Sequence, residues 1–181
     1  HQRRQKKGFR KAQKLEREDI LPSIELRPKE VEKRKEIGHW EGDTLVSKRG
    51  QERVKSVNER MSGVVFFKKP LDGTSTSCNQ AAVDRLKAIP SEYLKTLTQD
   101  RGFENFNFKI VEKELGLSCY FAHPYCSHER GSNENANVIF RRYFPKGTDF
   151  TKVSQREINV VIFEINSKPR KYLGYNTGPK M

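Results

Sequence analysis

Short apolar runs separated by turn-forming residues set the pattern of the chain after residue 37. Residues 42–47, 53–57 and 64–68 each hold β-branched or aromatic residues, and polar or glycine-containing turns lie between them. Segments of this length that are bounded by turns are typical of β-strands. Because the three segments follow one another with short connections, we predict that they form an antiparallel meander.

After residue 73 the apolar residues recur at a helical spacing. The residues with this spacing are Cys78, Ala82, Leu86 and Ile89. Thr74 or Ser75 can cap the start of this helix, and Pro90 ends it. The elements that follow are predicted, in the order strand, helix, strand, helix, at residues 96–99, 106–115, 118–121 and 134–144.

A final helix is predicted to start at residue 154. Ser154 and Glu157 have the spacing of a capping box. The residues that form an apolar stripe behind it are Ile158, Val161, Ile162 and Ile165. The complete order is β-β-β-α-β-α-β-α-α. It predicts an α/β fold in which a five-stranded mixed sheet is flanked by helices on both faces.

Composition narrows the class of partner. The 181 residues carry a net charge of +13, and 33% of them are charged. Such a balance favours a polyanionic partner, of which nucleic acid is the commonest, although a basic face can also be merely solvated. No apolar stretch approaches the roughly 20 residues of a membrane span. Three cysteines are too few for a disulfide framework, so we expect a cytoplasmic protein.

The charge pattern also divides the chain. Five cations and no acid lie in the first ten positions, namely Arg3, Arg4, Lys6, Lys7 and Arg10. We predict that residues 1–36 are a basic arm and linker, with the linker at 21–36, and that the arm lies along phosphates. The globular domain is predicted at 37–177, and a short tail at 178–181.

Three acids occupy positions that suit metal-dependent phosphodiester chemistry. Asp43 lies in the first predicted strand, Asp100 follows the fourth, and Glu134 opens a predicted helix. Two divalent ions held by carboxylates can activate a nucleophile and stabilise a leaving alkoxide, and oxygen ligands suit Mg²⁺ or Mn²⁺. Taken singly, each acid is more often an ordinary turn, cap or first-turn residue. Only the combination indicates a site.

Three motifs resemble those of a known family, the insertion-sequence-thirty family of bacterial DDE transposases. The first is IGHWEGDT at residues 37–44, and the second is LTQDRGFE at 97–104. The third runs from YFAHPY at 120–125 through ERGSNENAN at 129–137 to RRYFPKGTDF at 141–150. The 33 residues between Asp100 and Glu134 match the spacing of that family.

The resemblance implies a function. It implies an RNase H-like integrase-type core in which Asp43, Asp100 and Glu134 are catalytic and hold two Mg²⁺ or Mn²⁺ ions. The implied reaction is cleavage of transposon ends and strand transfer into target DNA. A homo-oligomeric synaptic complex at the bacterial nucleoid is implied as well. The candidate DNA contacts are Arg130, Arg141, Arg142, Lys146 and Arg170.

Other interpretations stay open at this stage. The chain could be a stand-alone RNase H-like nuclease, or a catalytically inactive DNA-binding remnant of a transposase. Cys119, His123, Cys126 and His128 lie within ten residues, but their spacing is not that of a usual zinc site. Glu41 shares a strand face with Asp43, where a solvated rim position is the plainer expectation.

Overall fold

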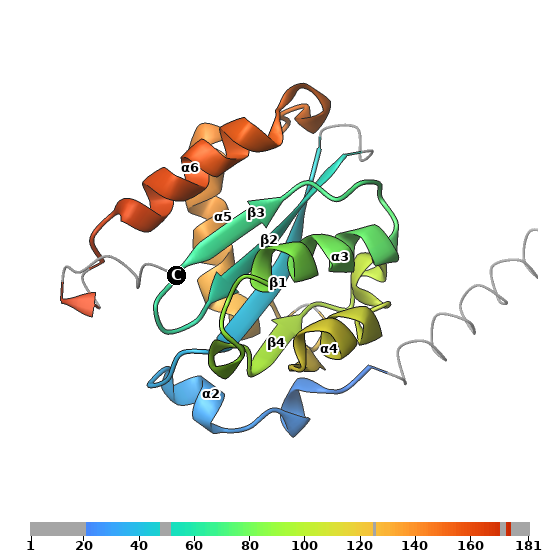
Figure 1. The fold of residues 1–181 in the computed structure, drawn as a ribbon, viewed down its shortest axis with the longest axis vertical. Coiled ribbons are helices and arrows are strands. Elements are labelled where there is room, and N and C mark those ends of the chain that lie inside the picture. The colour runs from blue at the N-terminus through green and yellow to red at the C-terminus, as the bar shows by residue number, and fades with distance from the viewer. Residues whose placement is uncertain (1–20, 48–51, 125, 171–172, 175–181) are drawn as a thin grey trace, which may run out of the picture.

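A five-stranded mixed sheet forms the centre of the protein (Figure 1). The computed structural model describes residues 21–47, 52–124, 126–170 and 173–174. The strands are β1 (His39–Val46), β2 (Arg53–Glu59), β3 (Val65–Lys68), β4 (Thr96–Gln99) and β5 (Ser118–Phe121). They lie in the order β3-β2-β1-β4-β5. β1, β2 and β3 pair antiparallel, whereas β4 is parallel to both β1 and β5. The predicted meander and mixed sheet are therefore confirmed.

Helices cover both faces of this sheet (Figure 1). One face packs against α3 (Ser75–Leu86) and α4 (Lys109–Leu115), and the other against α5 (Gly131–Tyr143) and α6 (Gln155–Ser167). Each side has its own apolar core, because successive strand residues point to opposite faces. Trp40 and Leu86 belong to the core beside α3, whereas Phe67 and Phe140 stack in the core beside α5.

Local capping explains where two of the helices begin. The Thr74 hydroxyl accepts a hydrogen bond from the Ser77 N–H at 3.2 Å, and α3 starts at the next residue. Ser154 and Glu157 form the predicted capping box at the start of α6. Such caps satisfy N–H groups that have no partner within the helix.

Two helix starts differ from the prediction. α4 begins at Lys109 rather than at residue 106, because a 3₁₀ turn, η3 (Phe103–Asn105), precedes it. α5 begins at Gly131 rather than at residue 134, directly after a second 3₁₀ turn, η4 (Ser127–Arg130). Glu134 therefore lies inside α5 and does not open it. The remaining short turns are η1 (Ile24–Leu26), η2 (Ser91–Tyr93) and η5 (Phe150–Lys152).

The prediction that residues 21–36 form a linker is wrong, because this segment packs on the domain. It contains η1 and a short helix, α2 (Glu30–Lys33), and the Val31 side chain is completely buried. The Phe121 N–H donates to the Pro22 carbonyl at 2.8 Å, so the segment also joins the edge of the sheet. Apolar contacts and one backbone bond outweigh the alternating charges that suggested a linker.

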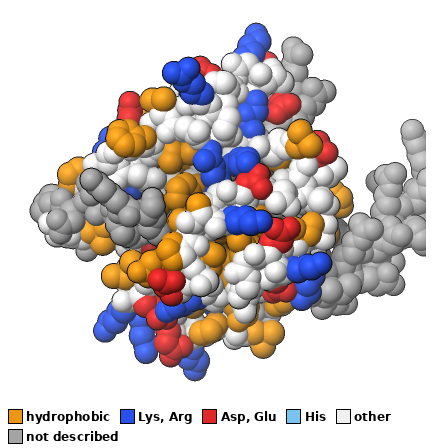
Figure 2. All heavy atoms as spheres, in the orientation of Figure 1, with side chains coloured by type: hydrophobic (Ala, Val, Ile, Leu, Met, Phe, Trp, Pro, Cys, Tyr) orange, Lys and Arg blue, Asp and Glu red, His pale blue; other side chains and the backbone are white. Residues whose placement is uncertain are grey.

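The strongly basic segment at residues 1–20 and the tail at 178–181 lie outside the described residues. On the face shown in Figure 2, Lys and Arg side chains lie among Asp and Glu side chains. That face is therefore not a continuous basic stripe. Within the part of the chain that the structure describes, no helix has the length and apolar character needed to cross a membrane.

Candidate functional site

The parallel pairing of β1 with β4 places two of the three predicted acids together. Glu41 of β1 is level with Thr98 of β4. Continuing this register by two residues on both strands sets Asp43 beside Asp100. Both carboxylates are partly exposed, with 25% of the Asp43 side chain and 36% of the Asp100 side chain accessible. The carboxyl end of parallel strands is where α/β sheets commonly build their sites.

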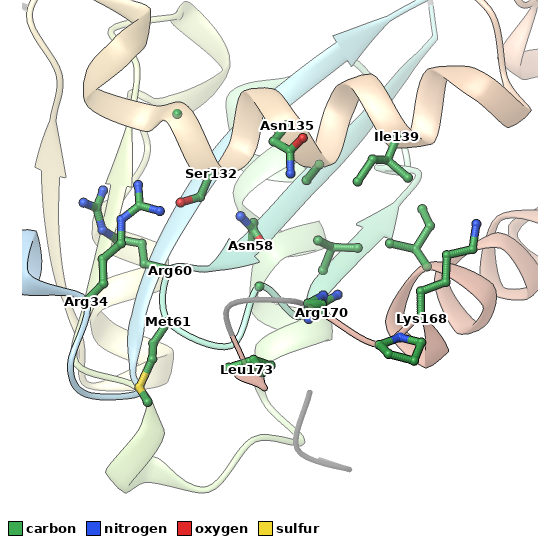
Figure 3. Close-up of a pocket in the computed structure, with 16 residues that line it drawn as sticks. Arg34, Asn58, Arg60, Met61, Ser132, Asn135, Ile139, Lys168, Arg170 and Leu173 are labelled. Carbon is green, nitrogen blue, oxygen red and sulfur yellow. The ribbon is translucent and has the colours of Figure 1, made fainter. Parts of the chain in front are cut away.

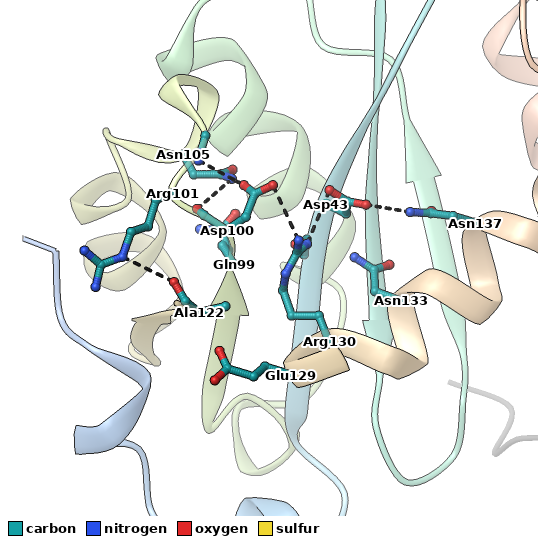
Figure 4. Close-up of polar contacts among 12 residues, drawn as sticks. Asp43, Gln99, Asp100, Arg101, Asn105, Ala122, Glu129, Arg130, Asn133 and Asn137 are labelled. Atoms are coloured by element: carbon teal, nitrogen blue, oxygen red, sulfur yellow. Dashed lines mark hydrogen bonds and ion pairs between the residues drawn. The ribbon is translucent and has the colours of Figure 1, made fainter. Parts of the chain in front are cut away.

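A single guanidinium lies between the two carboxylates (Figure 4). Arg130, at the end of η4, places Nη1 at 3.3 Å from Asp43 Oδ1 and Nη2 at 3.5 Å from Asp100 Oδ2. Its side chain is only 11% exposed. Two like charges held close together repel each other unless a cation lies between them. The space between the two carboxylates therefore favours a positive charge, and in this structure the guanidinium of Arg130 provides it.

Amide side chains fix the orientation of both carboxylates. Asn105 Nδ2 donates to Asp100 Oδ1 at 2.6 Å, and the Gly102 N–H donates to the same oxygen at 3.1 Å. Asn137 Nδ2 donates to Asp43 Oδ2 at 2.7 Å (Figure 4). Each acid thus keeps an oxygen for a cation while a fixed donor holds the other.

A buried lysine lies behind Asp100 and was not anticipated from the sequence. Lys55 on β2 is 1% exposed, and its Nζ donates to Gln99 Oε1 at 2.7 Å and to Asn105 Oδ1 at 2.6 Å. Burial lowers the pKa of Lys55, and the nearby Asp100 and Asp43 oppose this shift. Lys55 therefore orients the amide that holds Asp100. The alternating pattern of β2 predicts the face of the sheet to which Lys55 points. Nothing in the sequence indicates that this side chain lies close to Asp100.

A second buried carboxylate anchors the start of α5. Glu41 is completely buried, pairs with the guanidinium of Arg60 and accepts a hydrogen bond from the Asn133 N–H at 2.8 Å. A carboxylate at this place satisfies a free N–H of the first helical turn. Burial raises the pKa of Glu41, whereas Arg60 and the Asn133 N–H lower it. The expectation of a solvated rim position for Glu41 is wrong, because α5 covers this part of β1.

Glu134 is not gathered with the two aspartates. Its side chain is exposed on α5, and no three His, Cys, Asp or Glu side chains among the described residues lie close enough to hold a metal ion together. Glu134 nevertheless lies four positions after Arg130 and three before Asn137. Asn137 lies on the same face of α5 as Glu134 and contacts Asp43, as does Arg130 in the turn just before the helix. Glu134 thus lies on the same flank of α5 as Asn137, with its side chain exposed.

The other predicted DNA contacts lie farther along the chain. Arg141 donates to the Val46 carbonyl at 3.3 Å and lies over the ring of Phe150, so it takes part in the fold. Arg170 donates to the Ser62 carbonyl. Arg142 and Lys146 are exposed near the end of α5. None of these four contacts Asp43 or Asp100 in the described structure, which leaves Arg130 as the predicted contact at the site itself.

The alternative of a zinc site finds no support in the geometry. Cys119 is buried in β5, where burial raises the pKa of its thiol far above the usual range. Zinc binds the thiolate, so this environment works against it. His123 is held instead by Glu129, and the side chain of His128 lies outside the described residues.

The pairing of His123 with Glu129 leads to a pH prediction. His123 Nδ1 lies 2.8 Å from Glu129 Oε1, and this hydrogen bond raises the pKa of His123 above its usual 6.5. A histidine whose pKa is higher in the folded than in the unfolded protein stabilises the fold when it is protonated. This stabilisation is complete at pH values below the pKa of the unfolded state, and it is lost as pH rises through the pKa of the folded state. Titration followed by NMR should give a midpoint above 6.5 that falls toward 6.5 in Glu129→Gln. Glu25→Gln, which removes a weaker partner, should change it less. A wild-type midpoint at or below 6.5 would refute the pairing.

Sequence comparison relates the chain to transposases of insertion elements. The transposase InsI for insertion sequence element IS30A of Escherichia coli strain K12 is 36% identical over 154 residues, which are 85% of this chain and 40% of the relative. The transposase for element IS1086 of Cupriavidus metallidurans is 35% identical over 87% of this chain and 46% of the relative. The transposase for element IS4351 of Bacteroides fragilis is 34% identical over 85% and 47%. The chain thus spans less than half the length of these relatives. No family model matches the chain.

Comparison with solved structures shows the fold. A chain in a cryo-electron microscopy structure of a simian T-cell lymphotropic virus intasome superposes with a TM-score of 0.57 at 18% identity, over 71% of this chain and 48% of that one. The catalytic core domain of BIV integrase gives 0.56 at 16% identity, over 78% and 91%. Integrase catalytic cores have the RNase H-like fold, so the predicted fold class is confirmed.

Proposed function

Because this chain is a relative of the IS30-type transposases over most of its own length, we propose that it is the catalytic domain of a DNA transposase. The proposed reaction is cleavage at the ends of a mobile element and transfer of the freed strands into target DNA. The observation that carries the proposal is the pair Asp43, within β1, and Asp100, directly after the adjacent parallel strand β4, whose carboxylates contact the same guanidinium.

The donor set fits a hard divalent cation. Two carboxylates face a single cationic group, and oxygen ligands of this kind suit Mg²⁺ or Mn²⁺. Asp43 and Asp100 would hold such an ion, and Glu134, from the neighbouring helix face, would complete the site. When bound, divalent ions polarise the phosphodiester and stabilise the charge that develops on the oxygens.

The chain's own residues then do three things. Asn105 and Asn137 keep the two aspartates oriented, so that little motion is needed before reaction. Glu41 fixes the start of the helix that carries Glu134. Arg130, once separated from the aspartates, has a bidentate guanidinium that suits a phosphate oxygen. Arg141, Arg142, Lys146 and Arg170 remain candidate contacts to the DNA backbone farther from the site.

A test of this function uses a DNA substrate that can react even if the chain does not recognise the ends of the element. A branched duplex that represents the strand-transfer product can be resolved by the reverse reaction. With Mg²⁺ or Mn²⁺, the chain should release the short arm and rejoin the target strand. Cleavage without rejoining would favour a nuclease. DNA binding with no metal-dependent product would favour an inactive remnant.

Partners follow from the same proposal. Transposon ends and target DNA are the proposed substrates, and joining two ends in one event calls for more than one copy of the catalytic domain. Sedimentation of the chain with paired end duplexes should then show a complex that contains at least two copies. A complex with one copy on each DNA molecule would contradict this.

The position of Arg130 predicts an unusual effect on metal affinity. Its guanidinium competes with a divalent ion for Asp43 and Asp100, so Arg130→Gln should tighten Mn²⁺ binding by about three- to tenfold, where tenfold corresponds to about 1.4 kcal/mol. Calorimetric titration measures this directly. Arg101→Gln is the matched control, because it removes the same charge from a side chain that donates to the Ala122 carbonyl instead (Figure 4). Equal affinities in wild type and Arg130→Gln would show that the two cations do not compete.

A further inference from the structure

A cavity lies on the far flank of α5 from the two aspartates. It has a volume of about 640 Å³ and opens between β2, β3, the first half of α5, the end of α6 and residues 168–170 and 173. The α5 residues that line it are Gly131, Ser132, Asn135, Ala136 and Ile139. Asn133 and Asn137, on the other flank, contact β2 and Asp43. The helix therefore separates two sites that do not share side chains.

The lining has one sign of charge. Four cations line the cavity, namely Arg34, Arg60, Lys168 and Arg170, and its described lining contains no Asp or Glu, while Arg60 also pairs with Glu41 and Glu32 outside the lining. Arg34 is exposed, and its charge interacts with the buried carboxylate of Glu41 as well as with the cavity. A concave surface lined by one sign of charge concentrates ligands of the opposite sign. The cavity is therefore suited to an anion.

The polar end of the cavity also holds side-chain atoms without partners. Arg60 Nε, Ser132 Oγ and Asn58 Oδ1 are buried and have no hydrogen-bond partner in the described structure. Asn58 is 2% exposed and Arg60 is 5% exposed. In Figure 3 the hydroxyl of Ser132 points toward the guanidinium groups at that end. Because burial of an unpaired polar atom is costly, a ligand that reached these three atoms would gain by bonding to them.

Arg60 Nε and Ser132 Oγ can donate a hydrogen bond, whereas Asn58 Oδ1 can only accept one. A single ligand must therefore offer both acceptor and donor groups to satisfy all three atoms. A phosphate has acceptor oxygens only, and these match Arg60 Nε, Ser132 Oγ and the guanidinium of Arg34. Asn58 Oδ1 needs a donor such as an amino or hydroxyl group. At the other end, Val65, Ile139 and Ile165 offer an apolar wall. A flat, largely apolar ring system fits against such a wall, and the volume lies within the usual range for small-molecule sites.

We propose that this cavity binds a nucleoside monophosphate unit, with its phosphate at Arg34, Arg60 and Ser132 and its base against Ile139 and Ile165. The unit comes either from an unpaired nucleotide of DNA or from a free nucleotide. Unstacked bases are the ones that proteins read in pockets of this kind. The DNA source rests on the proposed transposase function, whereas binding of the nucleotide itself does not.

The test measures binding without divalent ions, so that it is independent of catalysis. The ¹⁵N-labelled chain is titrated with dAMP and with inorganic phosphate, and the side-chain amide signals of Asn58 and Asn135 are followed by NMR. Two DNA hairpins that differ only in a short single-stranded overhang are compared by fluorescence anisotropy. We expect dAMP to shift both amides and to bind at least about fivefold more tightly than phosphate. Tighter binding of the overhang hairpin identifies DNA as the source, and equal binding of the two hairpins identifies a free nucleotide.

Matched charge reversals separate the cavity from general surface charge. Arg34→Glu should weaken dAMP binding about tenfold, whereas Lys35→Glu makes the same charge change one residue away, outside the cavity lining. Asn135→Asp, which adds an acid to the lining, should weaken binding as well without touching the sheet. Equal weakening by Arg34→Glu and Lys35→Glu would overturn the proposal, as would phosphate binding as tightly as dAMP. If strand transfer fails while dAMP binding holds, only the DNA source is lost.

Discussion

Asp43→Asn and Asp100→Asn should each reduce strand transfer by at least about 10³-fold, which is the scale of effect seen when a central member of a catalytic unit is removed. Each change keeps the size of the side chain and removes the charge that holds a cation. Both side chains are partly exposed, so the folded domain should survive. The branched-DNA assay measures the loss, and thermal unfolding checks the fold.

Glu134→Gln should reduce strand transfer by a factor of the same order. This variant tests the proposed site more strictly than the aspartate variants do. Glu134 is exposed and is not gathered with the two aspartates in this structure. Asp84→Asn is the control, since Asp84 pairs with Lys68 on the surface of α3. Activity that persists in Glu134→Gln but not in the aspartate variants would show that another acid completes the site. Glu129, which pairs with His123, would then be the next to replace.

Glu41→Gln should lower the free energy of unfolding by about 3 kcal/mol, at the lower end of the range for breaking a buried ion pair. The change leaves the guanidinium of Arg60 buried, with its side chain 3% exposed, and partnered only by the exposed Glu32 at 3.2 Å. It also weakens the bond that holds the Asn133 N–H. Urea denaturation measures the effect.

The same variant tests how the site is supported. Because Glu41 anchors the start of α5, amide exchange should quicken in the first turns of this helix more than in α3. Glu114→Gln removes a surface acid whose side chain is 37% exposed, and should stay within about 0.5 kcal/mol of wild type. A Glu41→Gln protein as stable as this control would show that the buried pair contributes little beyond the desolvation it costs.

Much of the fold was predictable from local patterns. The strand at 96–99, the Thr74 cap and the Ser154 capping box were read correctly, because periodicity and capping depend on residues close in sequence. The start of α5 differs from the prediction, because the polar run at 132–137 forms the first turns of a helix and buries only Asn133 and Ala136 there. The packing of residues 21–36 was missed for a related reason. Its charged residues dominate the pattern, while burial of Val31 and a backbone bond from Phe121 decide its place.

The sequence by itself determined the order of the elements, with Asp43 in the first strand and Asp100 directly after the fourth. The two acids come together because β1 lies beside β4 in the sheet and pairs with it in parallel, which no local pattern of residues determines. Only the tertiary structure decided what surrounds them. Arg130 between the carboxylates, Lys55 behind Asp100 and Glu41 under α5 come from elements far apart in the chain. Burial and ion pairing depend on which elements meet, and no local pattern of residues encodes that.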